Sequence, residues 1–232
     1  LNDMLARLED SFRRLKDFSS DLAHELRTPI SNLMGRAQVT LSRVRSAEDY
    51  RVALEDSIEE LTRLNRIITD MLFLAQVDAP RQQLALKPVA LADEAQRVVE
   101  LFALSAECKA ITLKVSGWGT VQGDRLMLQR ALSNLLSNAI RHSPEGRLVE
   151  IGIEQSARGV QCWVRNEGPG IEAVHWPHLF ERFYRVGCGR SRVEGGTGLG
   201  LAIVQSIMQV HGGQVEVSSA AQGPTRFSLI FG

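Results

Sequence analysis

Leucines recur at every seventh position at the start of the chain, at Leu1, Leu8, Leu15 and Leu22. A second row with the same spacing runs beside the first and comprises Leu5, Phe12, Ser19 and Leu26. Two such rows, spaced four and three residues apart, form the a/d seam of a coiled coil or helical bundle. Because glycine is almost absent up to Val77, we expect this part of the chain to be helical.

A second amphipathic helix is predicted from about Ala47 to Val77. It has two apolar rows, and one of them comprises Leu54, Ile58, Leu61, Ile68 and Leu72. A helix with two apolar rows contacts more than one neighbour, as in a four-helix bundle. One chain supplies two such helices, so a homodimer is the simplest way to complete the bundle.

The residue pattern changes after "DAPRQQ", where glycines and β-rich runs appear. The run from 148 to 165 reads as an antiparallel hairpin whose turn is Ala157-Arg158-Gly159. Helical patterns separate the β-rich runs, at about 91–106, 124–142 and 199–211. These alternations predict a mixed α/β domain.

The predicted organisation has three parts. Residues 1–78 form a coiled-coil entry helix and dimerisation domain, and residues 87–232 form the α/β domain. Residues 79–86 are the expected linker, because they contain Pro80 and a polar cluster.

The composition excludes several classes of partner. Lys and Arg number 27 and Asp and Glu number 27, so no net charge directs the chain to nucleic acid or to an anionic membrane. The three cysteines are far apart and give neither a metal-ligand spacing nor a disulfide framework. No apolar run reaches the roughly 18 residues of a membrane helix. Because the sequence starts inside a helix at Leu1, we expect a fragment of a longer, membrane-anchored protein.

Asn134 and Asn138 lie in "NLLSNAIRH" and, four residues apart, share one face of a predicted helix. Amide oxygens at this spacing can help to hold Mg²⁺ against phosphates. Arg141 and His142 follow one turn later and offer a cation for phosphate and a ring for stacking on a base. A solvated helix face that merely tolerates asparagine is the alternative for so short a motif.

Two glycine-rich segments follow. "NEGPGI" contains Gly168 and Gly170 directly after a predicted strand, and "GGTGLGLAIVQSIM" leads into a helix. Glycines permit close approach of backbone to a ligand, and a helix N-terminus attracts phosphate. The spacing matches neither a P-loop nor a dinucleotide-binding fingerprint.

His24 lies in "LAHELRTPI" beside Glu25 and one turn before a proline. If Leu1 occupies a d position, His24 falls at f, which faces away from the seam, so we expect it to be exposed. Pro29 removes the helical hydrogen bond to the carbonyl of Glu25 and is expected to bend the helix. Taken alone, this pattern also fits a solvent-exposed histidine without a role.

Taken together and in order, these segments resemble the sensor histidine kinases. The matching segments are "HELRTP" at 24–29, "NLLSNAIRH" at 134–142, "NEGPGI" at 166–171, "LFERFYR" at 179–185 and "GTGLGLAIV" at 196–204. The resemblance implies an all-α helical-hairpin dimerisation domain, which forms a four-helix bundle in the dimer. An α/β two-layer sandwich of the histidine kinase and Hsp90-like ATP-binding type follows it. "FSSDLAHELRTPISNL" and "DMLFLA" are similar to the subgroup that responds to copper, silver and other heavy metals.

In the helical domain, the resemblance makes His24 the phosphoacceptor. Glu25 would orient the ring and act as general base, and Thr28 would position water when the same enzyme dephosphorylates its partner. That partner is the receiver domain of a response regulator, which accepts phosphate on an aspartate. The fragment would be the cytoplasmic portion of a bacterial inner-membrane protein.

In the α/β domain, the resemblance implies binding of ATP and Mg²⁺. The implied Mg²⁺ ligands are Asn134 and Asn138, with Arg141 on phosphate and His142 on adenine. The remaining implied nucleotide-binding residues are Asn166, Gly168, Gly170, Gly196, Gly198, Leu199 and Gly200, together with Arg190 in a lid at about 186–197. Arg192 lies in the same lid. The family commonly has aspartate where this chain has Asn166, and an amide can still accept from the adenine amino group and donate to a ring nitrogen.

Two alternatives remain open. The chaperone, topoisomerase and mismatch-repair ATPases share this fold but carry a glutamate general base where this chain has Asn134, which argues against ATP hydrolysis. The second alternative is a nucleotide-binding dimeric signalling scaffold with weak or no kinase activity, and Asn166 is what supports it.

Overall fold

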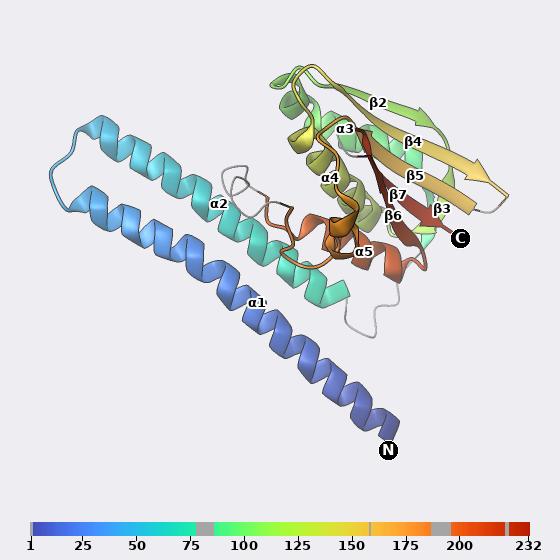
Figure 1. Cartoon of the computed structure of the whole chain (residues 1–232), viewed down its shortest axis with the longest axis horizontal. Helices are drawn as coiled ribbons and strands as arrows, with labels where there is room; N and C mark the ends of the chain where they lie inside the picture. Colours follow the sequence, from blue (N-terminus) through green and yellow to red (C-terminus); the bar gives the residue numbers. More distant parts are fainter. Residues whose placement is uncertain (1, 78–85, 158, 187–195, 221–222) are drawn as a thin grey trace. The chain divides into compact units, whose positions relative to one another are not determined.

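The structure, a computed structural model, describes residues 2–77, 86–157, 159–186, 196–220 and 223–232 (Figure 1). Within the first helix it describes the side chains of residue 20 and of residues 22–41. The chain divides into two compact units, Leu1–Leu72 and Phe73–Gly232. No helix among the described residues combines the length and the apolar character that crossing a membrane requires.

The first unit is a helical hairpin of α1 (Asn2–Leu41) and the greater part of α2 (Ala47–Val77). Helix α2 has the bounds that its sequence predicts. Helix α1 continues through Pro29. At its end, the Ser42 hydroxyl and the Arg45 guanidinium both donate hydrogen bonds to the carbonyl of Val39, at 2.8 and 3.2 Å. These bonds satisfy a carbonyl that the last turn leaves without a helical partner.

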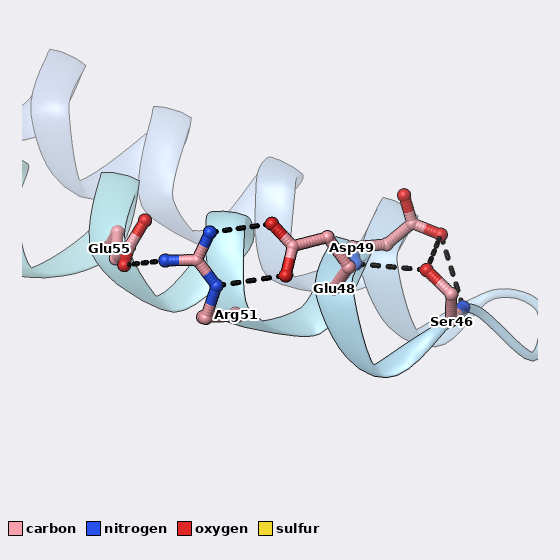
Figure 2. Close-up of polar contacts among 5 residues, drawn as sticks. All are labelled: Ser46, Glu48, Asp49, Arg51 and Glu55. Atoms are coloured by element: carbon pink, nitrogen blue, oxygen red, sulfur yellow. Dashed lines mark hydrogen bonds and ion pairs between the residues drawn. The ribbon is translucent and has the colours of Figure 1, made fainter.

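The start of α2 is held by a capping box between Ser46 and Asp49 (Figure 2). The backbone N–H of Asp49 donates to Ser46 Oγ at 3.1 Å, and the N–H of Ser46 donates to Asp49 Oδ2 at 3.1 Å. This reciprocal pair satisfies two donors of the first turn. The hydrogen bonds from the hydroxyl and the backbone of Ser46 lower the pKa of the Asp49 carboxyl. The turn therefore gives α2 a defined first residue.

Along α2 the row of Leu54, Ile58, Leu61, Ile68 and Leu72 is exposed, between 41% and 65% of each residue's surface. A continuous apolar row that faces water on a helix marks a surface that packs against another chain or segment. The first unit thus presents an unfilled helical seam.

The second unit is an α/β sandwich. Its elements, in chain order, are β1 (Lys87–Ala90), α3 (Leu91–Glu107), β2 (Thr112–Gly117), β3 (Thr120–Gly123), α4 (Arg125–His142), β4 (Leu148–Ser156), β5 (Gly159–Asn166), the 3₁₀ helix η1 (Ala173–His178), α5 (Gly200–Val210), β6 (Gln214–Ser219) and β7 (Thr225–Phe231). Five strands form one sheet in the order β2-β4-β5-β7-β6. The pairing is antiparallel throughout except between β2 and β4, which are parallel.

Helices α3, α4 and α5 cover one face of this sheet, which makes two layers (Figure 1). The alternation along the strands explains the layering, because every second residue of β5 and β7 points to the helices. Buried residues on that face include Val160, Cys162, Val164, Phe227 and Leu229. Burial raises the pKa of the Cys162 thiol to about 12, so this cysteine packs as an uncharged apolar group.

The sequence predictions for this unit are largely confirmed. The three helices begin and end within one residue of their predicted bounds. The hairpin of β4 and β5 pairs Ser156 with Gly159, although Arg158 lies outside the described residues. The small sheet of β1 and β3 was not predicted. The predicted linker at 79–86 falls almost entirely outside the described residues and stays a prediction.

Candidate functional site

His24, Glu25 and Thr28 lie in α1. His24 and Thr28 are exposed, as predicted for His24, and Glu25 is half-buried. His24 and Thr28 are four residues apart and share one face of the helix. Within the described residues no hydrogen bond joins Glu25 to the His24 ring, so the orienting role of Glu25 stays a prediction. Pro29, the residue after Thr28, is buried.

In the second unit, α4 and the start of α5 bring Asn134 and Gly200 together. A Cβ atom on Gly200 would lie 3.3 Å from Oδ1 of Asn134, so the glycine lets the helix start approach the amide closely. Nδ2 of Asn134 is buried and has no hydrogen-bond partner among the described residues. Buried polar atoms are normally paired, so this atom marks a position that a ligand would complete. Rotation of the amide would present its oxygen instead, which is the donor that Mg²⁺ prefers.

Asn138 follows one turn later on the same face of α4 and is half-buried. At the end of that helix, Arg141 lies against the second glycine-rich segment. A Cβ atom on Gly196 would lie 2.7 Å from Nη1 of Arg141. The fold therefore places the Arg141 cation and the Asn134 amide beside the glycines that lead into α5, and Asn138 lies one turn along α4 from Asn134. Such a donor set fits a phosphate chain with a magnesium ion.

The glycine-rich segment is itself tied to "LFERFYR". The N–H of Phe183 donates to the carbonyl of Gly198 at 2.9 Å. Gly198 has φ +72°, and a Cβ atom there would lie 2.7 Å from the Cα of Phe183. Only glycine combines this conformation with this contact. Leu199 is fully buried, and its N–H donates to Thr197 Oγ1 at 3.3 Å.

Asn166 ends β5 and is 6% exposed. Its Nδ2 donates to the carbonyl of Glu167 at 3.3 Å, which leaves Oδ1 with no donor among the described residues. A Cβ atom on Gly168 would lie 2.8 Å from the carbonyl oxygen of His142 and 3.3 Å from Nδ2 of Asn166. The structure thus brings the end of β5 and the end of α4 together, as the sequence prediction requires.

Gly170 has φ +73° and turns the chain toward η1. The next residue, Ile171, donates its N–H to Ser219 Oγ at 2.8 Å and accepts a hydrogen bond from Trp176 Nε1 at 3.1 Å. This segment is therefore anchored to β6. Arg190, which was predicted to contact phosphate from a lid, and Arg192, which was placed in the same lid, lie outside the described residues.

Two residues that the sequence reasoning missed hold α4 in place. Lys109 Nζ donates to the carbonyls of Ile140 and Arg141 at 3.1 and 3.0 Å. Glu94, which is 4% exposed, lies 3.0 Å from Arg125 Nε at the other end of the helix. Lys109 and Ile140 are 31 residues apart in the chain, and so are Glu94 and Arg125. A local sequence pattern therefore predicts neither contact.

A cavity of about 340 Å³ lies beside the C-terminal half of α4. Its lining residues are Phe102, Ser105, Lys109, Ser137, Ile140 and Arg141. Arg141 therefore borders both the cavity and the glycine-rich segment.

Two family models match this chain. Residues 14–80 match the "His Kinase A (phospho-acceptor) domain", and residues 123–231 match the "Histidine kinase-, DNA gyrase B-, and HSP90-like ATPase" family. The chain is 47% identical to the sensor protein IrlS of Burkholderia pseudomallei over 99% of its length and 50% of that protein. It is 45% identical to the sensor histidine kinase CusS of Escherichia coli K12 over 98% of its length and 48% of that protein. The chain thus spans about half the length of the curated relatives that it matches.

Solved structures with the same fold include ShkA and the histidine kinase ThkA. Full-length ShkA in complex with AMPPNP superposes with a TM-score of 0.66 and 28% identity, over 90% of this chain and 44% of that one. The histidine kinase ThkA in complex with the response regulator protein TrrA gives a TM-score of 0.74 at 23% identity, over 93% of this chain and 61% of that one.

A phospho-acceptor domain and an ATPase domain, joined in that order and matched along nearly the whole chain, show that this protein belongs to the sensor histidine kinases.

Proposed function

We propose that this chain is the phosphoryl-transferring core of a two-component sensor kinase. In this proposal ATP phosphorylates His24, and the phosphohistidine then passes its phosphoryl group to an aspartate of a response regulator. The observation that carries the proposal is the union, in one chain, of a phospho-acceptor domain with an exposed histidine and an ATPase domain with an unpaired buried amide.

The chemistry asks little of the protein beyond positioning and neutralisation of charge. One ring nitrogen of His24 attacks the γ-phosphorus, a P–N bond forms, and the bond to the bridging oxygen breaks as ADP leaves. Glu25 holds the proton on the other ring nitrogen, which raises the basicity of the attacking one. When the same enzyme dephosphorylates the response regulator, Thr28 positions the attacking water.

On the nucleotide side, Asn134 and Asn138 would hold Mg²⁺, which neutralises phosphate charge when it is bound. Arg141 contacts phosphate, and Gly196, Gly198, Leu199 and Gly200 line the phosphate chain with backbone. Asn166 accepts a hydrogen bond from the adenine amino group, with His142 beside the base. The short approaches between Asn134 and Gly200 and between Arg141 and Gly196 support this assignment.

The chain acts as a homodimer in this proposal. The exposed apolar row of α2 supports it, because burial of that row requires a partner, and a second hairpin supplies a matching surface. The cytoplasmic location of this part, and a membrane anchor and heavy-metal response in a longer protein, belong to the same proposal.

The decisive experiment is transfer of ³²P from [γ-³²P]ATP with Mg²⁺ to the purified chain and to its His24→Gln variant. We expect label that is stable in alkali and labile in acid, as a phosphoramidate is, and that is absent from the variant. His178→Gln is the matched control, because His178 is also an exposed histidine but lies on η1. A receiver domain added to the labelled chain should then remove the label.

The competing functions give different outcomes. A chain that binds ATP but never becomes labelled is a nucleotide-binding scaffold. A chain that releases inorganic phosphate at the same rate with His24→Gln is a hydrolase of the gyrase and HSP90 type.

A further inference from the structure

Helices α4 and α5 run antiparallel and meet at two separated points. At one point Gly200, the first residue of α5, approaches Asn134 in the middle of α4. At the other, His211 at the end of α5 contacts Asp124, which precedes the first residue of α4. Eleven residues separate Gly200 from His211, and ten separate Asp124 from Asn134. At about 1.5 Å per residue the two spans are nearly equal in length.

Both ring nitrogens of His211 are engaged, and their partners define the protonation state. Nδ1 lies 2.7 Å from the carbonyl oxygen of Ile207, which can only accept, so Nδ1 carries a hydrogen. Nε2 lies 2.9 Å from the backbone nitrogen of Asp124, which can only donate, so Nε2 is the acceptor. The ring is therefore neutral, with its proton on Nδ1.

The surroundings of His211 are built for this contact. A Cβ atom on Gly123 would lie 3.2 Å from both Cδ2 and Nε2 of the ring, so glycine leaves the space that the ring occupies. Asp124 is the N-cap of α4, and its carboxylate accepts a hydrogen bond from the N–H of Met127 at 3.0 Å. The Asp124 N–H lies outside the helical hydrogen bonds, and the His211 ring satisfies it.

We infer that His211 is a positioning residue for the nucleotide site. By holding Asp124, it sets the register of α5 along α4 and so the distance of Gly196 and Gly200 from Arg141 and Asn134. A slip of one residue would move the glycines by about 1.5 Å. A shift of this size would weaken the contacts between the glycine backbone and phosphate and so lower the affinity for ATP. The inference rests on the proposed function, because it takes the facing ends of the two helices as the nucleotide site.

The test compares His211→Phe, which keeps a ring but removes the acceptor, with His211→Gln, whose amide oxygen can accept from Asp124. We expect His211→Phe to raise the KM for ATP about tenfold, with a smaller change in kcat, because one hydrogen bond that orders the site is lost. His211→Gln should recover most of the affinity. Gln209→Leu, an exposed change on the same helix, is the control for substitution in α5.

A purely structural role would lower the melting temperature of His211→Phe without changing its KM for ATP where it is folded, and that result overturns the inference. If His211→Phe does not fold while His211→Gln does, His211→Leu is measured in its place. Failure of both acceptor-free variants to fold also overturns the positioning role. Failure of the unmodified chain to label His24 would instead refute the proposed function. The affinities of the unmodified chain and of His211→Phe for ATP, measured by calorimetry, then test the positioning role of His211 separately.

Discussion

Lys109 Nζ donates a hydrogen bond of 3.0 Å to the carbonyl of Arg141, the residue whose guanidinium lies against Gly196. A lysine from the turn after α3 thus binds the carboxyl end of α4, where the helix dipole is negative. Lys109 therefore fixes the backbone of Arg141, the residue whose guanidinium faces the glycine-rich segment.

Replacement of Lys109 by methionine keeps the aliphatic stem and removes the charge. We expect the free energy of unfolding to fall by about 1–2 kcal/mol, because two charge-assisted hydrogen bonds at a helix end are lost. Urea denaturation measures this change. Lys114→Met is the control, because Lys114 is exposed and lies 3.5 Å from its ion-pair partner Glu150. Equal effects of the two changes would contradict the capping role.

Alanine substitutions at Gly198 and Gly212 can distinguish the cost of a left-handed backbone conformation from the cost of a steric clash. Both have similar positive φ angles, +72° and +67°, but a Cβ atom on Gly198 would meet Phe183 whereas one on Gly212 would meet nothing within 4 Å. We expect Gly212→Ala to destabilise the chain by about 1 kcal/mol through the left-handed conformation alone. Gly198→Ala should cost about 3 kcal/mol, because the backbone of Phe183 must also move. Calorimetric melting of both variants compares them, and equal losses would show that the Phe183 contact yields easily.

Asn166→Asp tests how the base is recognised. A carboxylate accepts more strongly than an amide oxygen, so we expect ATP to bind about three- to tenfold more tightly. The nucleotide-free chain should be less stable, because Asn166 is buried and a carboxylate there has no cationic partner among its described contacts. Isothermal titration calorimetry with ATP reads the first effect and thermal melting reads the second. Weaker binding by the variant would indicate that the amide N–H also contacts the base.

The capping box of Ser46 and Asp49 makes the hairpin sensitive to acid. The pKa of Asp49 is lowered in the folded chain, so its stabilising contribution is complete above the ordinary value of 3.8 and is lost as the pH falls through the lower, folded value. We expect Asp49→Asn to reduce helicity at pH 7 but to match the unmodified chain well below pH 3.8. Circular dichroism across this pH range is the measurement. A constant difference between the two proteins at all pH values would refute the assignment.

Much of this fold could be predicted because its signals are local. The bounds of α2 follow from its apolar rows, and "GTGLGLAIV" predicts a helix start where α5 begins. Strands β1 and β3 escaped prediction because each has four residues and they contain proline or glycine. They pair with each other across the intervening helix α3, which a local pattern does not show.

The contacts that hold α4 and α5 in place were not predicted, for a different reason. The bond between His211 and Asp124 joins residues 87 positions apart, and Lys109 reaches Arg141 across 32. Such contacts depend on how the helices pack on the sheet, which periodicity alone does not specify. The residues proposed to touch the nucleotide occur in short motifs, whereas those that hold the motifs in place are scattered.

The hydrogen bond from Phe183 to Gly198 has a consequence for how substitutions act near the start of α5. Both residues have positive φ angles, +62° and +72°, so two left-handed positions face each other across this bond. A substitution that changes the backbone conformation at one of them would break the bond and release the other. The segment "LFERFYR" and the glycines that lead into α5 are therefore expected to change together rather than one at a time.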